Sequence, residues 1–223
     1  MKKVMFNDRY GLTYAVMEGC KTNMRRIEGD IQFQLAATAA EDFTYEEATG
    51  CIVMCCQGVE IFRHKCRYNV GEVVAIAECY FYIRNFVVGE EYDDRLCEAY
   101  EIEYTEDVVD LAGWSNKMFV RADLMPHQIR ITGIKCERLQ NISEEDCMKE
   151  GIYRDYADTK FPPREFYDYD GNEANGFNTP RKAFASLIDK VSGKGTWKRN
   201  PWVVAYEFEL VKQQDSMQNI AKL

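Results

Sequence analysis

The chain has 223 residues, 46% of them hydrophobic, and its 37 acidic against 28 basic side chains give a net charge of −9. Five prolines and 14 glycines exclude a disordered chain rich in these residues, and no apolar window is long enough to span a bilayer. A negatively charged chain repels a polyanion overall, so contact with nucleic acid would need a local basic surface.

The first residues, Met1 to Asp8, turn polar too early for a signal peptide, which predicts a cytoplasmic protein with no membrane contact. The nine cysteines are then expected to be reduced thiols, most of them in apolar strands. No cofactor-binding motif stands out, and we expect none to be bound.

Helical spacing of apolar residues predicts a helix over residues 9–18, and Gly19 follows where a left-handed cap is favoured. The strand expected next carries three cations: Lys21, Arg25 and Arg26. Arginine side chains match phosphate and carboxylate geometry, whereas a buried lysine can lose its proton and act as a base. An ordinary solvated surface is the alternative.

Residues 31–40 are apolar and rich in alanine without firm periodicity, and residues 41–50 have the acidic composition of a loop. Cys51–Cys56 and Val59–His64 are apolar runs separated by Gln57 and Gly58, which predicts a β-hairpin.

The same hairpin contains Cys51, Cys55, His64 and Cys66, whose side-chain types are the usual ligands of zinc. Their spacing departs from the common C-x2-C pattern, and the cysteines lie in an apparent strand. We therefore predict no metal, and keep this set only as an alternative.

Residues 73–81 form a nearly continuous apolar run, which predicts a strand covered on both faces. Glu78 lies inside it and must be paired, at a rim or in a site. Residues 84–113 are variable and acidic, and apolar alternation from Ile129 predicts a long strand that contains Arg130.

Ser143 followed by three carboxylates predicts the start of an acidic helix that stops at Gly151. A polar, tyrosine-rich loop is expected over residues 153–178 and a capped helix over residues 180–192. A final strand precedes a frayed tail at residues 213–223.

Four stretches in this order resemble the ASCH family of small domains. They are G-x-K-T-x-x-R-R from Gly19, YNVGEVVA from Tyr68, MPHQIRITGIKCERLQNISEEDCMKEG from Met125, and the strand that begins at Asn200-Pro201-Trp202-Val203.

The resemblance implies a mainly β fold with helices (α+β): a PUA-like β-barrel with flanking helices and an inserted hairpin. It implies one domain over residues 1–212, with insertions near residues 31–66, 84–113 and 153–178. PUA-like domains bind RNA, so RNA or a small nucleoside or nucleotide in a cationic cleft is the ligand that the resemblance implies.

The side chains expected to line this cleft come from the first motif and from later strands, one of which family members place over residues 114–121. They are Thr22, Arg25, Arg26, Arg121, Arg130 and Trp114. Arginines would contact phosphates and the tryptophan would stack on a base.

Some ASCH proteins are amidohydrolases that remove the acyl group of N4-acetylcytidine. Lys21 matches their lysine and Glu150 their glutamate, so these two are the catalytic candidates, with a structural ion pair as the alternative. Met24 stands where those enzymes have threonine, and a thioether is neither nucleophile nor donor, which places binding ahead of catalysis. A protein partner for the acidic surface is a third reading.

Overall fold

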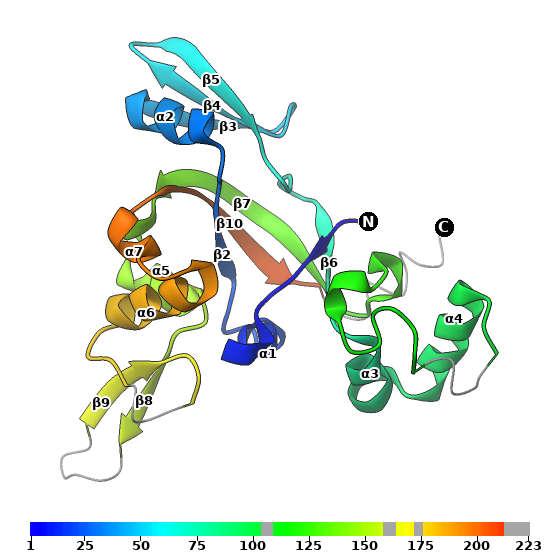
Figure 1. Cartoon of the computed structure of the whole chain (residues 1–223). Helices are drawn as coiled ribbons and strands as arrows, with labels where there is room; N and C mark the ends of the chain where they lie inside the picture. Colours follow the sequence, from blue (N-terminus) through cyan, green and yellow to red (C-terminus); the bar gives the residue numbers. More distant parts are fainter. Residues whose placement is uncertain (104–108, 158–163, 172–175, 212–223) are drawn as a thin grey trace. The chain divides into compact units, whose positions relative to one another are not determined.

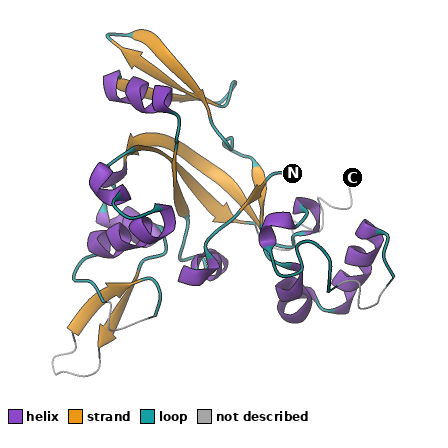
Figure 2. Ribbon diagram, in the orientation of Figure 1, coloured by secondary structure: helices purple, strands orange, loops and turns teal. Residues whose placement is uncertain are grey.

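The computed structural model (Figure 1) describes residues 1–103, 109–157, 164–171 and 176–211. These residues form sheets of five, three and two strands together with α-helices (Figure 2), which confirms a mixed fold of strands and helices. None of the described helices is both long and apolar enough to cross a membrane.

The strands, in chain order, are β1 (Lys3–Val4), β2 (Asn23–Ile27), β3 (Asp42–Glu46), β4 (Cys51–Cys56), β5 (Val59–Lys65), β6 (Val73–Ile76), β7 (Gln128–Arg138), β8 (Tyr153–Ala157), β9 (Arg164–Asp168) and β10 (Trp202–Leu210). The α-helices are α1 (Leu12–Met17), α2 (Ile31–Ala39), α3 (Tyr80–Ile83), α4 (Glu90–Tyr100), α5 (Glu144–Lys149), α6 (Pro180–Ser192) and α7 (Thr196–Arg199). Shorter helical turns are η1 (Asp8–Tyr10), η2 (Arg84–Val88), η4 (Lys117–Phe119), η5 (Ala122–Leu124) and η6 (Leu139–Asn141).

The chain divides into two compact units. The first contains residues 1–6, 73–130 and 210–223, and the second contains residues 7–72 and 131–209. The expectation of a single domain with insertions stays a prediction.

The five-stranded sheet has the order β1-β6-β7-β10-β2. In the first unit β1 runs parallel to β6, and β6 pairs antiparallel with the start of β7. In the second unit β10 pairs antiparallel with β2, from Val203 opposite Ile27 to Glu207 opposite Asn23. The order of the described strands has two ends, β1 and β2, so a closed barrel stays a prediction.

The strand predicted over residues 73–81 lies in the core of the first unit and is shorter than predicted. Strand β6 ends at Ile76, and α3 begins at Tyr80, whose side chain is fully buried beside Tyr92 of α4. The apolar run is continuous because buried residues of the strand, Val74 to Ile76, are followed by buried Ala77 and by Tyr80 of the helix, and not because one strand spans it. The strand expected over residues 114–121 is also wrong: η4 lies there.

In the second unit, elements whose caps or turns can be recognised in the sequence match their predictions. Helix α6 begins with the Thr179 cap, which accepts a hydrogen bond from the Lys182 amide, followed by Pro180. Strands β4 and β5 form the predicted hairpin around Gln57-Gly58.

The helix predicted over residues 9–18 is split at Gly11 (φ 63°) into η1 and α1.

Three expectations in the second unit are corrected. Helix α2 forms in the stretch without firm periodicity. Strand β3 forms in the expected acidic loop and pairs with β4, and strands β8 and β9 pair within the expected polar loop. In α2 the buried residues are Phe33 and Ala37, one helical turn apart, while Ile31 and Leu35 are 73% and 66% exposed. Exposed apolar residues therefore hid the helical period.

Candidate functional site

Lys21 and Glu150 meet in the second unit because two helices end side by side. Gly19 (φ 71°) reverses the chain after α1, and the Lys21 amide donates to the Ala15 carbonyl over 2.8 Å. Glu150 caps the C-terminus of α5 and forms an isolated antiparallel bridge with Lys21. The Ser143 hydroxyl fixes the other end of α5 by accepting from the Asp146 amide.

The lysine–glutamate pair is nearly sealed from water. Lys21 Nζ donates to Glu150 Oε2 over 2.6 Å and to the Glu150 carbonyl over 2.9 Å. Each residue is 4% exposed. Burial lowers the pKa of the Lys21 ammonium, and the Glu150 charge opposes that shift. The predicted proximity is present, while a catalytic role stays a prediction.

Arg25 on β2 joins the same group of charges. Its guanidinium lies 2.8 Å from Glu150 Oε1, 2.7 Å from Glu137 Oε1 and 3.1 Å from Asp146 Oδ2, with 1% of the side chain exposed. Burial alone would lower the Arg25 pKa, but Glu150 and Glu137 raise it. Arg25 therefore contacts carboxylates within the protein and presents no surface to a phosphate.

The ion cluster contains three cations and three carboxylates, since Lys135 Nζ lies 3.1 Å from Asp146 Oδ2. Its members are Lys21, Arg25, Lys135, Glu137, Asp146 and Glu150. At its edge, Lys149, which is paired with Glu145, lies 4.0 Å from Asp146 Oδ1. Because the formal charges balance, the cluster exerts little net attraction on a distant anion.

The other predicted ligand contacts are placed as follows. Thr22 is tied by its backbone to Lys149 and Phe208, and half-buried Arg26 lies beside the Met24 sulfur. In the first unit, Arg121 donates to Asp123 and to the Ala99 carbonyl.

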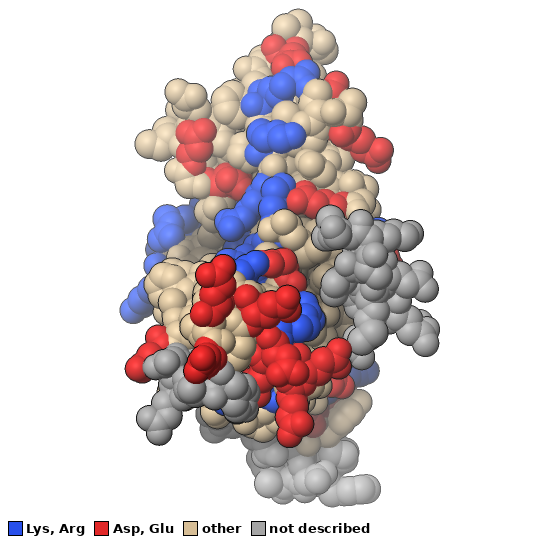
Figure 3. Space-filling model, turned by 90° about the vertical axis from the view of Figure 1, so that its right-hand side faces the viewer, with Lys and Arg blue, Asp and Glu red and all other residues tan. Residues whose placement is uncertain are grey.

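Trp114 and Arg130 also belong to the first unit. The Trp114 ring contacts Phe81 and lies under the Arg84 guanidinium. On the face in Figure 3, basic and acidic side chains are interspersed. None of these contacts tests the predicted ligand role.

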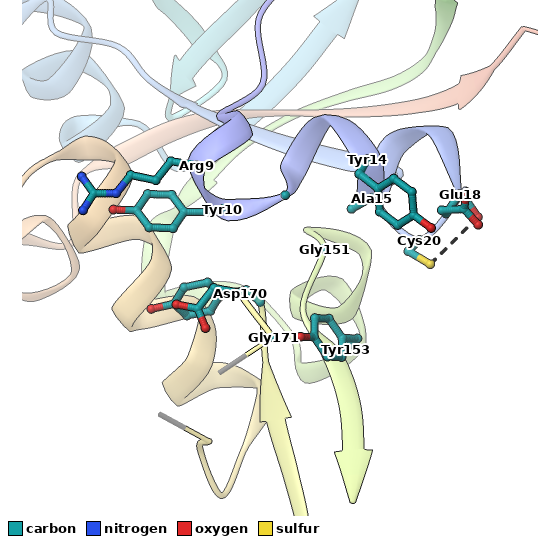
Figure 4. Close-up of a pocket in the computed structure, with 12 residues that line it drawn as sticks. Arg9, Tyr10, Tyr14, Ala15, Glu18, Cys20, Gly151, Tyr153, Asp170 and Gly171 are labelled. Carbon is teal, nitrogen blue, oxygen red and sulfur yellow. Dashed lines mark hydrogen bonds between the residues drawn. The ribbon is translucent and has the colours of Figure 1, made fainter. Parts of the chain in front are cut away.

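A pocket of about 480 Å³ lies in the second unit, next to the ion cluster. Figure 4 shows Tyr10 and Tyr14 on the α1 side and Tyr153 and Asp170 on the side of the β8–β9 hairpin. The lining residues are Arg9, Tyr10, Gly11, Tyr14, Ala15, Glu18, Cys20, Gly151, Tyr153, Tyr169, Asp170 and Gly171.

The wall of this pocket touches the buried pair. The Ala15 carbonyl accepts a hydrogen bond from the Lys21 amide. A Cβ atom on Gly151 (φ 95°) would lie 3.5 Å from Ala15 Cβ and 3.6 Å from Lys21 Cβ. Lys21 and Glu150 do not line the pocket themselves; Ala15, Cys20 and Gly151 do. The ion cluster therefore supports the pocket wall from behind.

Sequence reasoning missed this pocket. Tyr10 and Tyr14 fall in the helix predicted over residues 9–18, and Tyr153 and Tyr169 fall in the stretch expected to be a loop. Their common signal is tyrosine enrichment, but the pairing of β8 with β9 that positions the second pair has no local marker.

The zinc alternative gains no support from the described residues, among which no three His, Cys, Asp or Glu side chains are placed to hold a metal. Opposite residues of paired strands share a face, so Cys51 lies with Lys65, and His64 lies with Ile52 on the other face. His64 instead packs on Phe33 with a ring distance of 4.6 Å. Burial raises the pKa of Cys66 to about 12, which disfavours the thiolate.

No family model matches the chain, and no curated protein or solved structure is significantly similar to it. The resemblance to the ASCH family therefore rests on the four sequence motifs and stays an expectation.

Proposed function

We propose that the chain is an ASCH-type domain of the PUA-like class that binds a nucleoside in the tyrosine-lined pocket. The observation that carries this proposal is the convergence of Tyr10, Tyr14, Tyr153 and Tyr169 on one concavity. Aromatic rings stack on the flat faces of bases, and their hydroxyls supply the polar contacts that orient a ligand.

The charges around the pocket favour an uncharged nucleoside over RNA. The lining contains one cation, Arg9, and two carboxylates, Glu18 and Asp170. Lys190 lies over the Tyr169 ring at 4.9 Å and 3.7 Å from an Asp170 oxygen, so its charge is compensated. With a net charge of −9 overall, the chain is poorly suited to a long polyanion.

Calorimetric titration with cytidine, N4-acetylcytidine, cytidine monophosphate and a short single-stranded RNA tests this proposal. Saturable binding of a nucleoside with no gain from the phosphate is the expected result. Tyr14→Ala and Tyr153→Ala should each weaken binding about tenfold, because stacking a base on one ring contributes about 1–3 kcal/mol.

Tyr156→Ala is the matched control, because this tyrosine is 51% exposed on β8 and does not line the pocket. Equal loss in the control, or no saturable binding of any nucleoside at millimolar concentration, contradicts the pocket proposal. Salt-sensitive binding of RNA alone would instead favour exposed basic side chains outside the pocket.

The buried pair favours amidohydrolase activity on N4-acylated cytidine as a second candidate. Lys21 Nζ lies 2.6 Å from a Glu150 oxygen, and burial lowers the Lys21 pKa toward the range of a general base. Water would add to the acyl carbonyl while the neutral lysine accepts its proton. The lysine would then return this proton to N4 as the C–N bond breaks, so that acetic acid, which ionises to acetate, and cytidine leave.

Acetate release from N4-acetylcytidine tests this second candidate. Lys21→Met should abolish release, and Met24→Thr should increase it by restoring the hydroxyl that acylase members of the resembled family carry. If the wild type and Met24→Thr both release no acetate at high protein concentration, the hydrolase candidate is wrong.

A further inference from the structure

The first unit exposes three neighbouring aromatic side chains on α3 and η2. Phe81, Tyr82 and Phe86 are 46%, 43% and 69% exposed. The Tyr82 and Phe86 rings lie 5.3 Å apart, tilted by 35°, and Phe81 meets Trp114 edge-on at 5.9 Å. Single exposed apolar residues are common, but grouped ones mark interaction surfaces.

Phe81 and Tyr82 lie on α3, and Phe86 lies on η2. It is a π-helical turn, Arg84–Val88, that continues directly from α3. Tyr80 and Ile83 of α3 are fully buried, and Nδ2 of the Asn85 side chain donates to the Phe81 carbonyl over 2.7 Å. Such π-turns are frequent at functional sites. The buried side of the segment is therefore anchored while the aromatic side stays in solvent.

Helix α4 borders this aromatic face with negative charge. It is packed against α3 and η2 through Tyr92, whose ring is 6.3 Å from that of Tyr80, and through Asp93, which lies 2.9 Å from Arg84. Its outer face carries exposed carboxylates: Glu90, Glu91, Asp94 and Glu98. Figure 3 shows acidic side chains gathered at the height of α4.

We propose that this face, formed by Phe81, Tyr82 and Phe86 with the outer side of α4, binds a basic amphipathic helix of a partner protein. Apolar residues of the partner one turn apart would cover Tyr82 and Phe86. Its lysines or arginines would lie along Glu90, Glu91 and Asp94, as in other helix-in-surface complexes.

The same charges argue against the other occupants. In a symmetric dimer formed through this face, each α4 would approach the same acidic surface of a second copy, and like charges in an interface oppose association. An anionic bilayer or a nucleic acid would meet the same repulsion. A basic segment satisfies both the aromatic and the acidic part of the surface.

Fluorescence anisotropy with two labelled amphipathic peptides tests the proposal on the full chain. Both probes carry leucine at helical spacing; one has lysine and the other glutamate at all remaining positions. We expect saturable binding of the lysine probe and none of the glutamate probe at physiological salt.

Phe86→Ala and the double variant Glu90→Lys with Glu91→Lys should each weaken binding of the lysine probe about tenfold or more, as loss of a central contact does. Tyr156→Ala, an exposed aromatic of the other unit, should leave it unchanged. Circular dichroism checks that each variant is folded.

The proposal is overturned if both probes bind alike, or if Phe86→Ala binds the lysine probe as tightly as the wild type. It is also overturned if light scattering shows a dimer that Phe86→Ala converts to a monomer, because the occupant is then a second copy.

Discussion

Glu150 neutralises two buried cations, since one of its oxygens contacts Lys21 and the other contacts Arg25. Glu150→Gln should therefore lower the free energy of unfolding by about 3–5 kcal/mol, the usual cost of leaving a buried charge without its partner. Urea unfolding measures this change.

The adjacent exposed pair is the control for that substitution. Lys149 is 44% exposed and lies 2.7 Å from Glu145 one helical turn away, so Lys149→Gln should cost about 0.5 kcal/mol or less. If Glu150→Gln lowered the free energy of unfolding as little as Lys149→Gln does, the ion cluster would not stabilise the fold.

Cys147 makes stability depend on pH in the alkaline range. Burial raises its thiol pKa from 9.0 to about 12. Between these values the unfolded chain releases the proton and the folded chain keeps it, so the stability present below pH 9 is lost as pH rises toward 12. Cys147→Ala should reduce the slope of unfolding free energy against pH by up to about 1.4 kcal/mol per unit.

Urea unfolding at pH 9 and at one unit above measures that slope. Cys20→Ala, at an exposed thiol, should keep the wild-type slope. Identical slopes in all three proteins would show that Cys147 does not titrate differently in the two states.

At the level of single residues, the meeting of Lys21 with Glu150 could be predicted because both lie in motifs of a resembled family. The carboxylates around Arg25 could not. Glu137 and Asp146 lie more than a hundred residues away in sequence, and no local pattern specifies which strand face they share. The cation was therefore predicted to bind a ligand, whereas its charge is compensated internally.

At the scale of elements, α5 positions Glu150, and its start depends on one cap. The Ser143 hydroxyl accepts from the Asp146 amide over 3.0 Å. Ser143→Ala should lower the free energy of unfolding by about 1 kcal/mol, while Ser143→Asp should retain most of it because aspartate also caps well. Thermal or urea unfolding of the three proteins decides this. Equal stability of all three contradicts a role for the cap.

Elements with local signals were predicted well, and those fixed by distant contacts were not. The cap of α6 and the turn of the β4–β5 hairpin lie in the sequence itself. Strand β3 is acidic and needs β4 as its partner, and β8 needs β9. Composition alone assigned both to loops, because pairing across a sheet overrides local preference.

At the scale of the whole molecule, the division into two units has no marker in the sequence. The first unit is built from residues 1–6, 73–130 and 210–223, so no linker separates the two. Boundaries that the chain crosses several times leave no stretch of low complexity or proline. The single domain with insertions that the family resemblance implies stays a prediction.

The net charge of −9 gives the last prediction. Repulsion among surface carboxylates destabilises the folded chain, and salt screens it: the Debye length falls from about 30 Å at 0.01 M to about 8 Å at 0.15 M. Salt screens the buried ion cluster much less, so weaker attraction within the cluster should not cancel the stability gained at the surface. The melting temperature should therefore rise over this range of potassium chloride, by about 2–4 °C per kcal/mol gained.

Near pH 4.9, where the net charge vanishes, the rise should shrink. A melting temperature that falls with salt at pH 7 would mean that exposed ion pairs, not net repulsion, dominate the surface.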